Sequence, residues 1–204
     1  AYTGHAQLNY SWDIDGDGTY EFEYNDWLYA IKPSINDIKA IQYIYGMTPD
    51  FNEGDTDYVY KGPVYETIYD TGGIDTIDLS FYSGDFECDI TLDLRGGTVS
   101  YIGTAEIWIS KPSAAGSSDS YWGNSGFPIS IAENTVIENA ITGSGDDTIT
   151  CNIAANTIIC GLGNDTVYDI STGDSVYGGD GNDRFWIIAS DFTLIDGGNG
   201  TADE

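Results

Sequence analysis

The sequence predicts an all-β protein, in which an irregular β-sandwich layer leads into a parallel β-roll and one short helix lies near the N-terminus. In the last third of the chain, large apolar residues recur at every ninth position. Glycine–aspartate loops lie between alternate members of this series, and this combination is typical of a β-roll that binds calcium. The apolar series is Ile149, Ile158, Val167, Val176, Phe185 and Leu194.

Composition and charge limit the classes of partner. The 204 residues are 41% hydrophobic, so the chain can form packed cores, but 34 acidic residues face only 6 basic ones and the formal net charge is −28. This charge opposes binding to nucleic acids and to anionic membranes, and it favours bound cations. No apolar run is long enough to span a membrane. The sequence does not define an oligomeric state.

The cysteines are odd in number, which argues against a disulfide framework. Cys151 and Cys160 are one repeat apart, which is half a turn of a β-roll, so we expect them on opposite sheets or loops. We predict that Cys88, Cys151 and Cys160 are unpaired and act as small buried hydrophobic residues.

The chain divides into three expected regions: an N-terminal segment (1–46), a β-rich sandwich-like region (47–138) and the roll (139–204). A helix is predicted over 33–46, because Ser34 and Asp37 form a capping box and Gly46 can end the helix. Its apolar stripe, which we expect to pack in the core, consists of Ile35, Ile38, Ile41 and Tyr45.

A second candidate calcium loop lies in the N-terminal segment. The motif DIDGDG, with Asp13, Asp15 and Asp17, matches the first half of an EF-hand loop. The twelfth position is Tyr24 instead of glutamate. Calcium binding and a plain exposed acidic turn are both consistent with this segment.

The middle of the chain contains short alternating runs separated by turn residues, which predict strands. The polar segment 112–126 is expected to be a loop. The predicted strands lie in TDYVYKG, ETIYDTGG, IDTIDLSFY, DITLDL, TVSYIG and AEIWIS.

In each repeat of the roll, glycine allows a positive φ and a close approach to a metal, while aspartate and backbone carbonyls supply oxygen ligands. Two nonapeptides make one turn, so the loops on one edge come from every second repeat. The well-formed loops are all of one parity, and their predicted calcium ligands are Gly143, Gly145, Asp147, Gly161, Gly163, Asp165, Gly179, Gly181 and Asp183.

We therefore expect several calcium ions along one edge, between loops 143–147 and 161–165 and between 161–165 and 179–183. A further site between 179–183 and 197–203 is in doubt, because the glycines of the last loop are shifted by one position. The intervening repeats are degenerate, with Asn156 or Phe192 in place of aspartate and only Asp174 kept, so the other edge of the roll is expected to be mostly free of metal.

No capping segment follows the last glycine loop, and the chain starts at Ala1 without methionine. Because a solenoid needs a terminal cap, we expect the roll to be truncated at its C-terminal end and the sequence to be part of a longer protein.

The chain resembles the C-terminal part of the serralysin-type metzincin zinc metalloproteases. The resemblance covers roughly residues 33–204 and rests on NDIKAIQYIYG, YDTGGIDTIDLS, VIENAITGSGDD and the repeats that follow. It implies secretion by a bacterium through a type I system, and further calcium ligands ahead of the roll. By resemblance, these ligands are Asn52, Gly54, Thr56, Asp70, Gly72, Gly73, Asp75, Val136 and Glu138.

The chain departs from that family where catalysis is concerned. The proteases need the zinc motif H-E-x-x-H-x-x-G-x-x-H, whereas this chain has a single histidine, His5, and no such motif. The only methionine, Met47, follows the predicted helix, although the family's methionine turn should precede it. We therefore expect this chain itself to be non-catalytic.

Three functions are consistent with these observations. The first is a calcium-binding, non-catalytic RTX-type module of a secreted bacterial protein that folds on extracellular calcium. The second is the C-terminal part of a serralysin-like protease whose catalytic half lies outside this sequence. The third is an adhesive or surface-layer component that binds glycans through aromatic residues such as Tyr121 and Trp122. The substrate of a parent protein stays open between polysaccharide and protein.

Overall fold

The computed structural model describes residues 6–12, 22–28, 33–47, 50–62, 66–103, 106–112, 118–124 and 126–204. The acidic loop with Asp13, Asp15 and Asp17 lies outside the described residues, as does His5. The described part is built mainly of strands with one α-helix, which confirms the predicted all-β class. None of the helices among these residues has the length and hydrophobicity that a membrane crossing requires.

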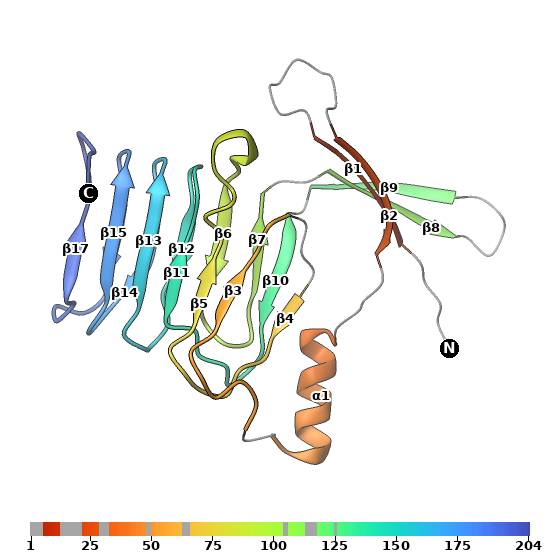
Figure 1. Ribbon diagram of the computed structural model, residues 1–204, viewed down its shortest axis with the longest axis horizontal. Coiled ribbons are helices and arrows are strands. Elements are labelled where there is room, and N and C mark those ends of the chain that lie inside the picture. The colour runs from red at the N-terminus through yellow and green to blue at the C-terminus, as the bar shows by residue number, and fades with distance from the viewer. Residues whose placement is uncertain are drawn as a thin grey trace.

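Two larger sheets face each other and form the body of the protein (Figure 1). The first, in spatial order, contains β16 (Arg184–Ile187), β14 (Thr166–Ile170), β12 (Thr148–Thr150), β6 (Ile90–Asp93), β7 (Val99–Ile102), β10 (Phe127–Ile131) and β4 (Glu66–Ile68). The second contains β17 (Leu194–Asp196), β15 (Ser175–Asp180), β13 (Thr157–Leu162), β11 (Asn139–Ile141), β5 (Thr76–Asp78) and β3 (Asp57–Val59).

The chain alternates between these sheets and winds as a parallel spiral. Each turn takes 18 residues through most of the roll, because Ile149 pairs with Val167 in one sheet and Ile158 pairs with Val176 in the other. The inward side chains of both sheets form one core, in which Ile149, Ile158 and Val167 have 0% exposure. The nine-residue series therefore places one apolar residue per strand in the interior.

The parallel winding extends further toward the N-terminus than the glycine repeats indicate. β5 pairs in parallel with β3 and β11, and β6 pairs in parallel with β12. Both sheets are therefore continuous across the expected boundary at residue 139. The antiparallel strands β7 and β10 extend the first sheet at its N-terminal end.

The last turn corrects the predicted apolar series. Ser175 pairs with Leu194 and Val176 pairs with Ile195, so the step is 19 residues at this point instead of 18. Ile195 packs against the core, while Leu194 is 39% exposed. The stretch from Phe185 to Leu194 is one residue longer than the stretch from Val167 to Ser175 one turn earlier, so the side chains of β17 lie on the opposite faces from those predicted.

The helix α1 (Ile35–Tyr45) has the predicted ends, because Ser34 and Asp37 form a capping box and Gly46 is the C-cap residue. The expectation that its apolar stripe packs in the core is wrong, since no residue of α1 is buried and Tyr45 is 83% exposed. The two sheets already cover each other's inner faces, and α1 lies outside them (Figure 1). An ion pair of 2.9 Å between Lys39 and Glu133 connects it to the roll.

Two antiparallel hairpins complete the described elements: β1 (Ala6–Trp12) with β2 (Phe22–Leu28), and β8 (Glu106–Pro112) with β9 (Ser118–Asn124). The segment 112–126, expected to be a loop, therefore contains a strand, and Tyr121 and Trp122 lie in it. A single 3₁₀ turn, η1 (Gly84–Phe86), precedes β6.

The cysteines agree with the prediction that they are unpaired. All three are free, Cys151 and Cys160 are buried, and Cys88 is half-buried. Cys160 lies in β13 of one sheet, and Cys151 directly follows β12 of the other.

Two isoleucines four positions apart test the assignment of the core. Ile149→Ala empties part of the core, because Ile149 has 0% exposure, and should lower the free energy of unfolding by about 2–5 kcal/mol. Ile153→Ala is the matched control, because Ile153 is 99% exposed and should change this free energy by less than about 0.5 kcal/mol. Urea unfolding in millimolar calcium measures both, and equal effects would contradict the assigned register.

Candidate metal centre

The glycine–aspartate loops 143–147, 161–165, 179–183 and 197–203 lie above one another along one edge of the roll, which we call the aspartate edge. The first three loops each lead from a strand of the second sheet into a strand of the first, and the loop 197–203 follows β17 of the second sheet. Parallel strands that pair 18 residues apart bring equivalent loop positions to successive levels of the stack. The three predicted aspartates Asp147, Asp165 and Asp183 are all buried, with exposures of 1%, 0% and 0%.

Glycine is required in these loops for two reasons. Gly163 and Gly181 have φ values of +124° and +141°, which side-chain-bearing residues rarely adopt. A Cβ at Gly163 would also collide with the carbonyl oxygen of Gly145, and one at Gly181 with that of Gly163. The loops therefore stack backbone against backbone, and a side chain at these positions would separate the turns.

One oxygen of each buried aspartate holds the stack together. The backbone N–H of Asp147 donates to Oδ1 of Asp165 at 2.8 Å, and the N–H of Asp165 donates to Oδ1 of Asp183 at 2.9 Å. At the start of this ladder, the N–H of Ile90 donates to Oδ1 of Asp147 at 2.8 Å. At its end, the N–H of Asp183 donates to Oδ1 of Asp203 at 3.1 Å.

The second carboxylate oxygen of these aspartates, Oδ2, takes no part in this hydrogen-bond ladder. Among the described residues, Oδ2 of Asp147, Asp165 and Asp183 is buried and accepts no hydrogen bond from the protein. A buried carboxylate oxygen without a partner is unfavourable, because the interior does not replace the water it has lost. Each of these oxygens, at equivalent positions of successive loops, is of the chemical type that a hard cation such as calcium prefers.

Electrostatics support this assignment. Burial raises the pKa of Asp147 to about 6 and that of Asp165 to about 8, and the pKa of Asp183 is also raised by burial. The charges of Asp147 and Asp183 add to the effect at Asp165. In the absence of a cation, the folded protein therefore disfavours the ionised form of its own loop aspartates.

The geometry of the last loop resolves part of the doubt about its register. Asp203 stands 20 positions after Asp183 and continues the carboxylate ladder, because the chain has one additional residue before β17 and one more within the last loop. Asp203 was not among the predicted ligands, although an acidic residue after the glycines of the final loop was a visible signal. A Cβ at Gly178 would lie 2.9 Å from the carbonyl oxygen of Gly197 and would collide with Oδ2 of Asp183, so both oxygens lie next to Gly178.

The ligands implied by the family resemblance also come together, on the opposite edge near β3, β5 and β11. The N–H of Thr56 donates to Oδ1 of Asp75, and the N–H of Asp75 donates to Oε2 of Glu138, both at 2.9 Å. Among the described side chains, Oδ2 of Asp75 is buried without a partner, and burial raises the pKa of Asp75 to about 6. This carboxylate therefore has the same unfavourable environment as those on the aspartate edge.

The loops around Asp75 pack as tightly as the repeats. Gly73 has a φ of +125°, and a Cβ there would lie 2.7 Å from the carbonyl of Gly54. Asn52 has a φ of +53° and starts the same loop. Asp70 is buried but differs from Asp75, because it accepts hydrogen bonds from the hydroxyl of Tyr58 and the N–H of Gly72. Val136, whose carbonyl is an implied ligand, has a 44% exposed side chain.

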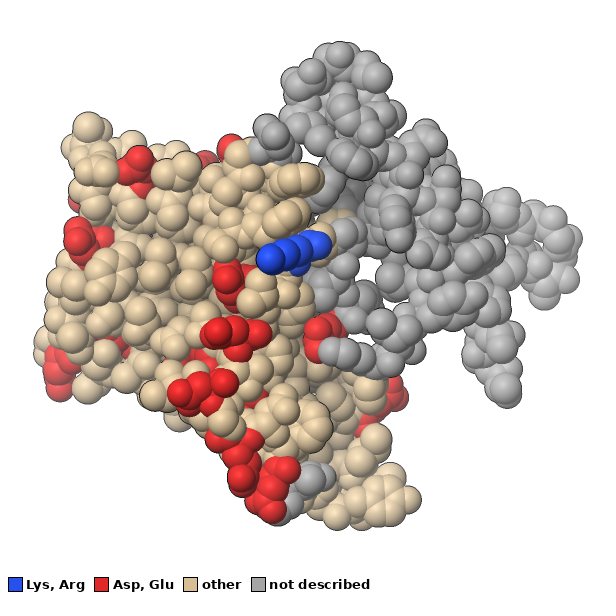
Figure 2. All heavy atoms as spheres, viewed as in Figure 1, with Lys and Arg blue, Asp and Glu red and all other residues tan. Residues whose placement is uncertain are grey.

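In the described part of the chain, no group of three or more His, Cys, Asp or Glu side chains converges on one point. Side chains alone therefore do not make a metal centre there, and a cation would need backbone carbonyls as further ligands. Acidic side chains also prevail over basic ones on the face shown in Figure 2.

Comparison with known proteins identifies the family. The family model described as "Peptidase M10 serralysin C terminal" matches residues 37–193. The chain belongs to this family. The matched family is the C-terminal region of serralysins, which agrees with a chain that carries no zinc motif.

Individual relatives agree with this assignment. Serralysin of Proteus mirabilis is 35% identical over 144 residues, which are 64% of this chain and 24% of that protein. Serralysin of Photorhabdus luminescens is 33% identical over 145 residues, which are 64% of this chain and 25% of that protein. Serralysin G of Dickeya chrysanthemi is 34% identical over 137 residues, which are 60% of this chain and 24% of that protein. The matched part thus spans about a quarter of the length of these relatives.

The raised pKa values predict an unusual pH dependence for the metal-free protein. A carboxyl group whose pKa is higher in the folded than in the unfolded state stabilises the fold below the unfolded pKa of about 4, and this contribution is lost as pH rises through the folded pKa. Because Asp147 and Asp165 titrate near 6 and 8, the chelated protein should have a higher melting temperature at pH 5 than at pH 8. Asp165→Asn should flatten the profile between pH 6 and 8. Higher stability of the chelated protein at pH 8 would contradict the assigned environment.

Proposed function

We propose that this chain is a calcium-binding, non-catalytic RTX-type module of a secreted bacterial protein, and that it folds when it meets extracellular calcium. The observation that carries the proposal is the set of buried Oδ2 atoms of Asp147, Asp165 and Asp183, which have no partner among the described residues. A divalent ion between successive loops would supply that partner and neutralise the stacked charges. Gly143, Gly145, Gly161, Gly163, Gly179 and Gly181 would contribute backbone carbonyls.

The energetics agree with folding coupled to calcium. A site filled at a hundred times its dissociation constant stabilises the folded state by about 2.7 kcal/mol, and several sites together are comparable with the stability of a whole domain. Extracellular calcium modules bind with dissociation constants of about 10⁻⁴–10⁻³ M, far above cytosolic calcium. The acidic repeats of a chain with a net charge of −28 would thus stay unfolded in the cytosol, and export by a type I system would bring them to the ions that fold them.

The relationship to serralysins supports a second proposal about the whole protein. The relatives are named as serralysins, and about three quarters of their length lies outside the match. The longer protein would then carry the zinc-dependent peptidase site, with this chain as its C-terminal calcium module. The purified chain should in that case have no peptidase activity, and the residues that precede Ala1 in the gene should contain the zinc motif.

Removal of calcium tests the main proposal. Excess chelator should lower the melting temperature sharply and remove much of the β-sheet signal in far-ultraviolet circular dichroism, because binding free energy is also folding free energy. Re-addition of millimolar calcium should restore the spectrum. An unchanged spectrum and melting temperature in excess chelator would refute calcium-dependent folding.

Two adjacent aspartates provide a matched test of the ligands. Asp165→Asn removes a charge from the loop shared by two expected sites, and should weaken calcium binding at least about tenfold in calorimetry. Asp146→Asn is the control, because Asp146 is exposed and keeps an oxygen that can accept from the backbone N–H of Asn164. Equal affinities of both variants and the wild-type chain would exclude Asp165 as a ligand.

A further inference from the structure

The edge opposite the aspartate edge contains two loops with different chemistry, 152–156 and 171–174, which we call the asparagine corner. Here Asn156 stands where the repeat pattern calls for aspartate. Its backbone N–H donates to Oδ1 of Asp174 at 2.7 Å, and the N–H of Ser171 donates to Oδ2 of Asp174 at 2.6 Å. Both oxygens of Asp174 therefore have protein donors, unlike those of Asp147, Asp165 and Asp183.

The side-chain amide of Asn156 connects successive turns of the roll. Its Nδ2 atom donates to the carbonyl of Glu138 at 3.0 Å and to Oδ1 of Asn152 at 3.1 Å. Its Oδ1 atom accepts the backbone N–H of Asn152 at 3.0 Å. Asn156 is 1% exposed, so these bonds are formed away from water, where an unmatched partner would be costly.

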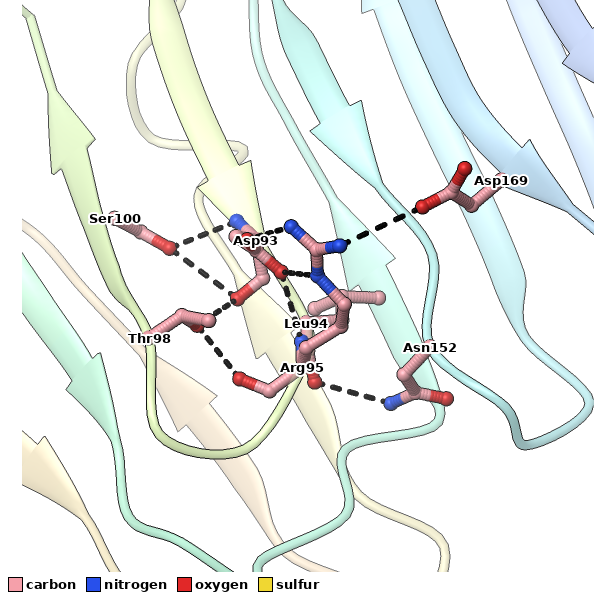
Figure 3. Close-up of polar contacts among 7 residues, drawn as sticks. All are labelled: Asp93, Leu94, Arg95, Thr98, Ser100, Asn152 and Asp169. Atoms are coloured by element: carbon pink, nitrogen blue, oxygen red, sulfur yellow. Dashed lines mark hydrogen bonds and ion pairs between the residues drawn. The ribbon is translucent and has the colours of Figure 1, made fainter.

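Asn152 extends the network to the turn that follows β6. Its Nδ2 atom donates to the carbonyl of Ile137 at 2.8 Å and to that of Leu94 at 3.1 Å, and the latter contact is drawn in Figure 3. In the same view, Arg95 forms a two-bonded pair with Asp93 and reaches Asp169 on β14 at 3.6 Å. The Arg95 pairs are largely exposed and contribute at most about 1 kcal/mol each, so the buried amides are the main connection.

The side-chain amides of Asn152 and Asn156 thus donate hydrogen bonds to carbonyl oxygens of neighbouring turns. On the aspartate edge, a divalent ion would connect oxygens of neighbouring turns in the same way. An amide nitrogen offers two donors regardless of ion concentration. We infer that Asn152 and Asn156 replace a calcium ion at this corner, so that the asparagine corner stays folded when calcium is removed while the aspartate edge opens. The inference rests on the proposed calcium function, and it gives the module a preformed nucleus from which ion binding completes the roll.

Such a nucleus has a physical consequence for folding. In repeat proteins each turn is stabilised mainly by its neighbours, so the first ordered turns are the costly ones and later turns add to them. A corner that connects residues 94, 137, 152 and 174 without ions would supply these first turns. Calcium would then act on loops that are already aligned by the strands of the nucleus.

Hydrogen–deuterium exchange measured by mass spectrometry, in millimolar calcium and in excess chelator, tests the inference. On chelation, peptides with the amides of Asp147, Asp165 and Asp183 should exchange at least about 100-fold faster, the factor set by loss of one well-filled site. Peptides with the amides of Asn156, Ser171 and Ser175 should change less than about tenfold. Equal acceleration at both edges would overturn the inference, whereas no acceleration at the aspartate edge would overturn the proposed function.

Two variants of Asn156 strengthen the test. Asn156→Ala should leave the calcium stoichiometry unchanged, and in chelator it should make the asparagine corner exchange as fast as the aspartate edge. Asn156→Asp keeps the shape of the side chain but replaces donors by a charge next to Asp174, and it should make the protection of this corner depend on calcium. If the Asp variant responded to chelator as the wild-type chain does, the amide would not have the assigned role, even if the Ala variant failed to fold.

Asn139→Ala is the matched control. Asn139 begins β11 beside the same corner, and its side-chain amide donates to the hydroxyl of Thr76 at 3.3 Å. This bond is long, links β11 to the neighbouring strand β5 of the same sheet, and involves neither Asn152 nor Asn156. The exchange of the asparagine corner in chelator should therefore stay within about threefold of the wild-type rate. A loss of protection as large as that of Asn156→Ala would show that any asparagine truncation here has this effect and would overturn the inference.

Discussion

The structure depends on carboxylates that are buried with half of their hydrogen-bonding capacity unused. Asp147, Asp165 and Asp183 each accept one backbone N–H from the preceding turn, so the aspartates set the register of the loops. The same burial leaves Oδ2 of each without a donor from the described residues and raises their pKa values. The roll is therefore shaped by groups that oppose its folding until a cation compensates them.

The aspartate edge and the asparagine corner resolve this conflict differently. On the aspartate edge the compensation has to come from outside the chain, which makes the stability of that edge depend on ion concentration. At the asparagine corner it comes from the chain itself. The backbone N–H groups of Asn156 and Ser171 donate to the two oxygens of Asp174, and the side-chain amides of Asn152 and Asn156 donate to carbonyls of neighbouring turns. A module that combines both solutions can keep a local nucleus and still respond to the calcium level around it.

The sequence predicted the roll well, because one apolar residue every nine positions leaves few other ways to form a core. The prediction was wrong at Leu194, because the degenerate repeat before it is one residue longer. Only the strand pairing shows that Ile195, and not Leu194, takes the inward position. The prediction also failed for α1, where an amphipathic stripe indicates which face is apolar but not whether another layer covers it. The role of Asn156 was hidden for a similar reason: a degenerate repeat and a hydrogen-bonded substitute for an ion look alike in sequence.

Anomalous diffraction from crystals grown in millimolar calcium tests the central claim most directly, because it locates the ions atom by atom. The account predicts calcium peaks within bonding distance, about 2.3–2.6 Å, of Oδ2 of Asp147, Asp165 or Asp183 and of glycine carbonyls in the adjoining loops. It predicts no peak beside Asn156. Loops of the aspartate edge that held only water at these oxygens, in crystals with millimolar calcium, would contradict it.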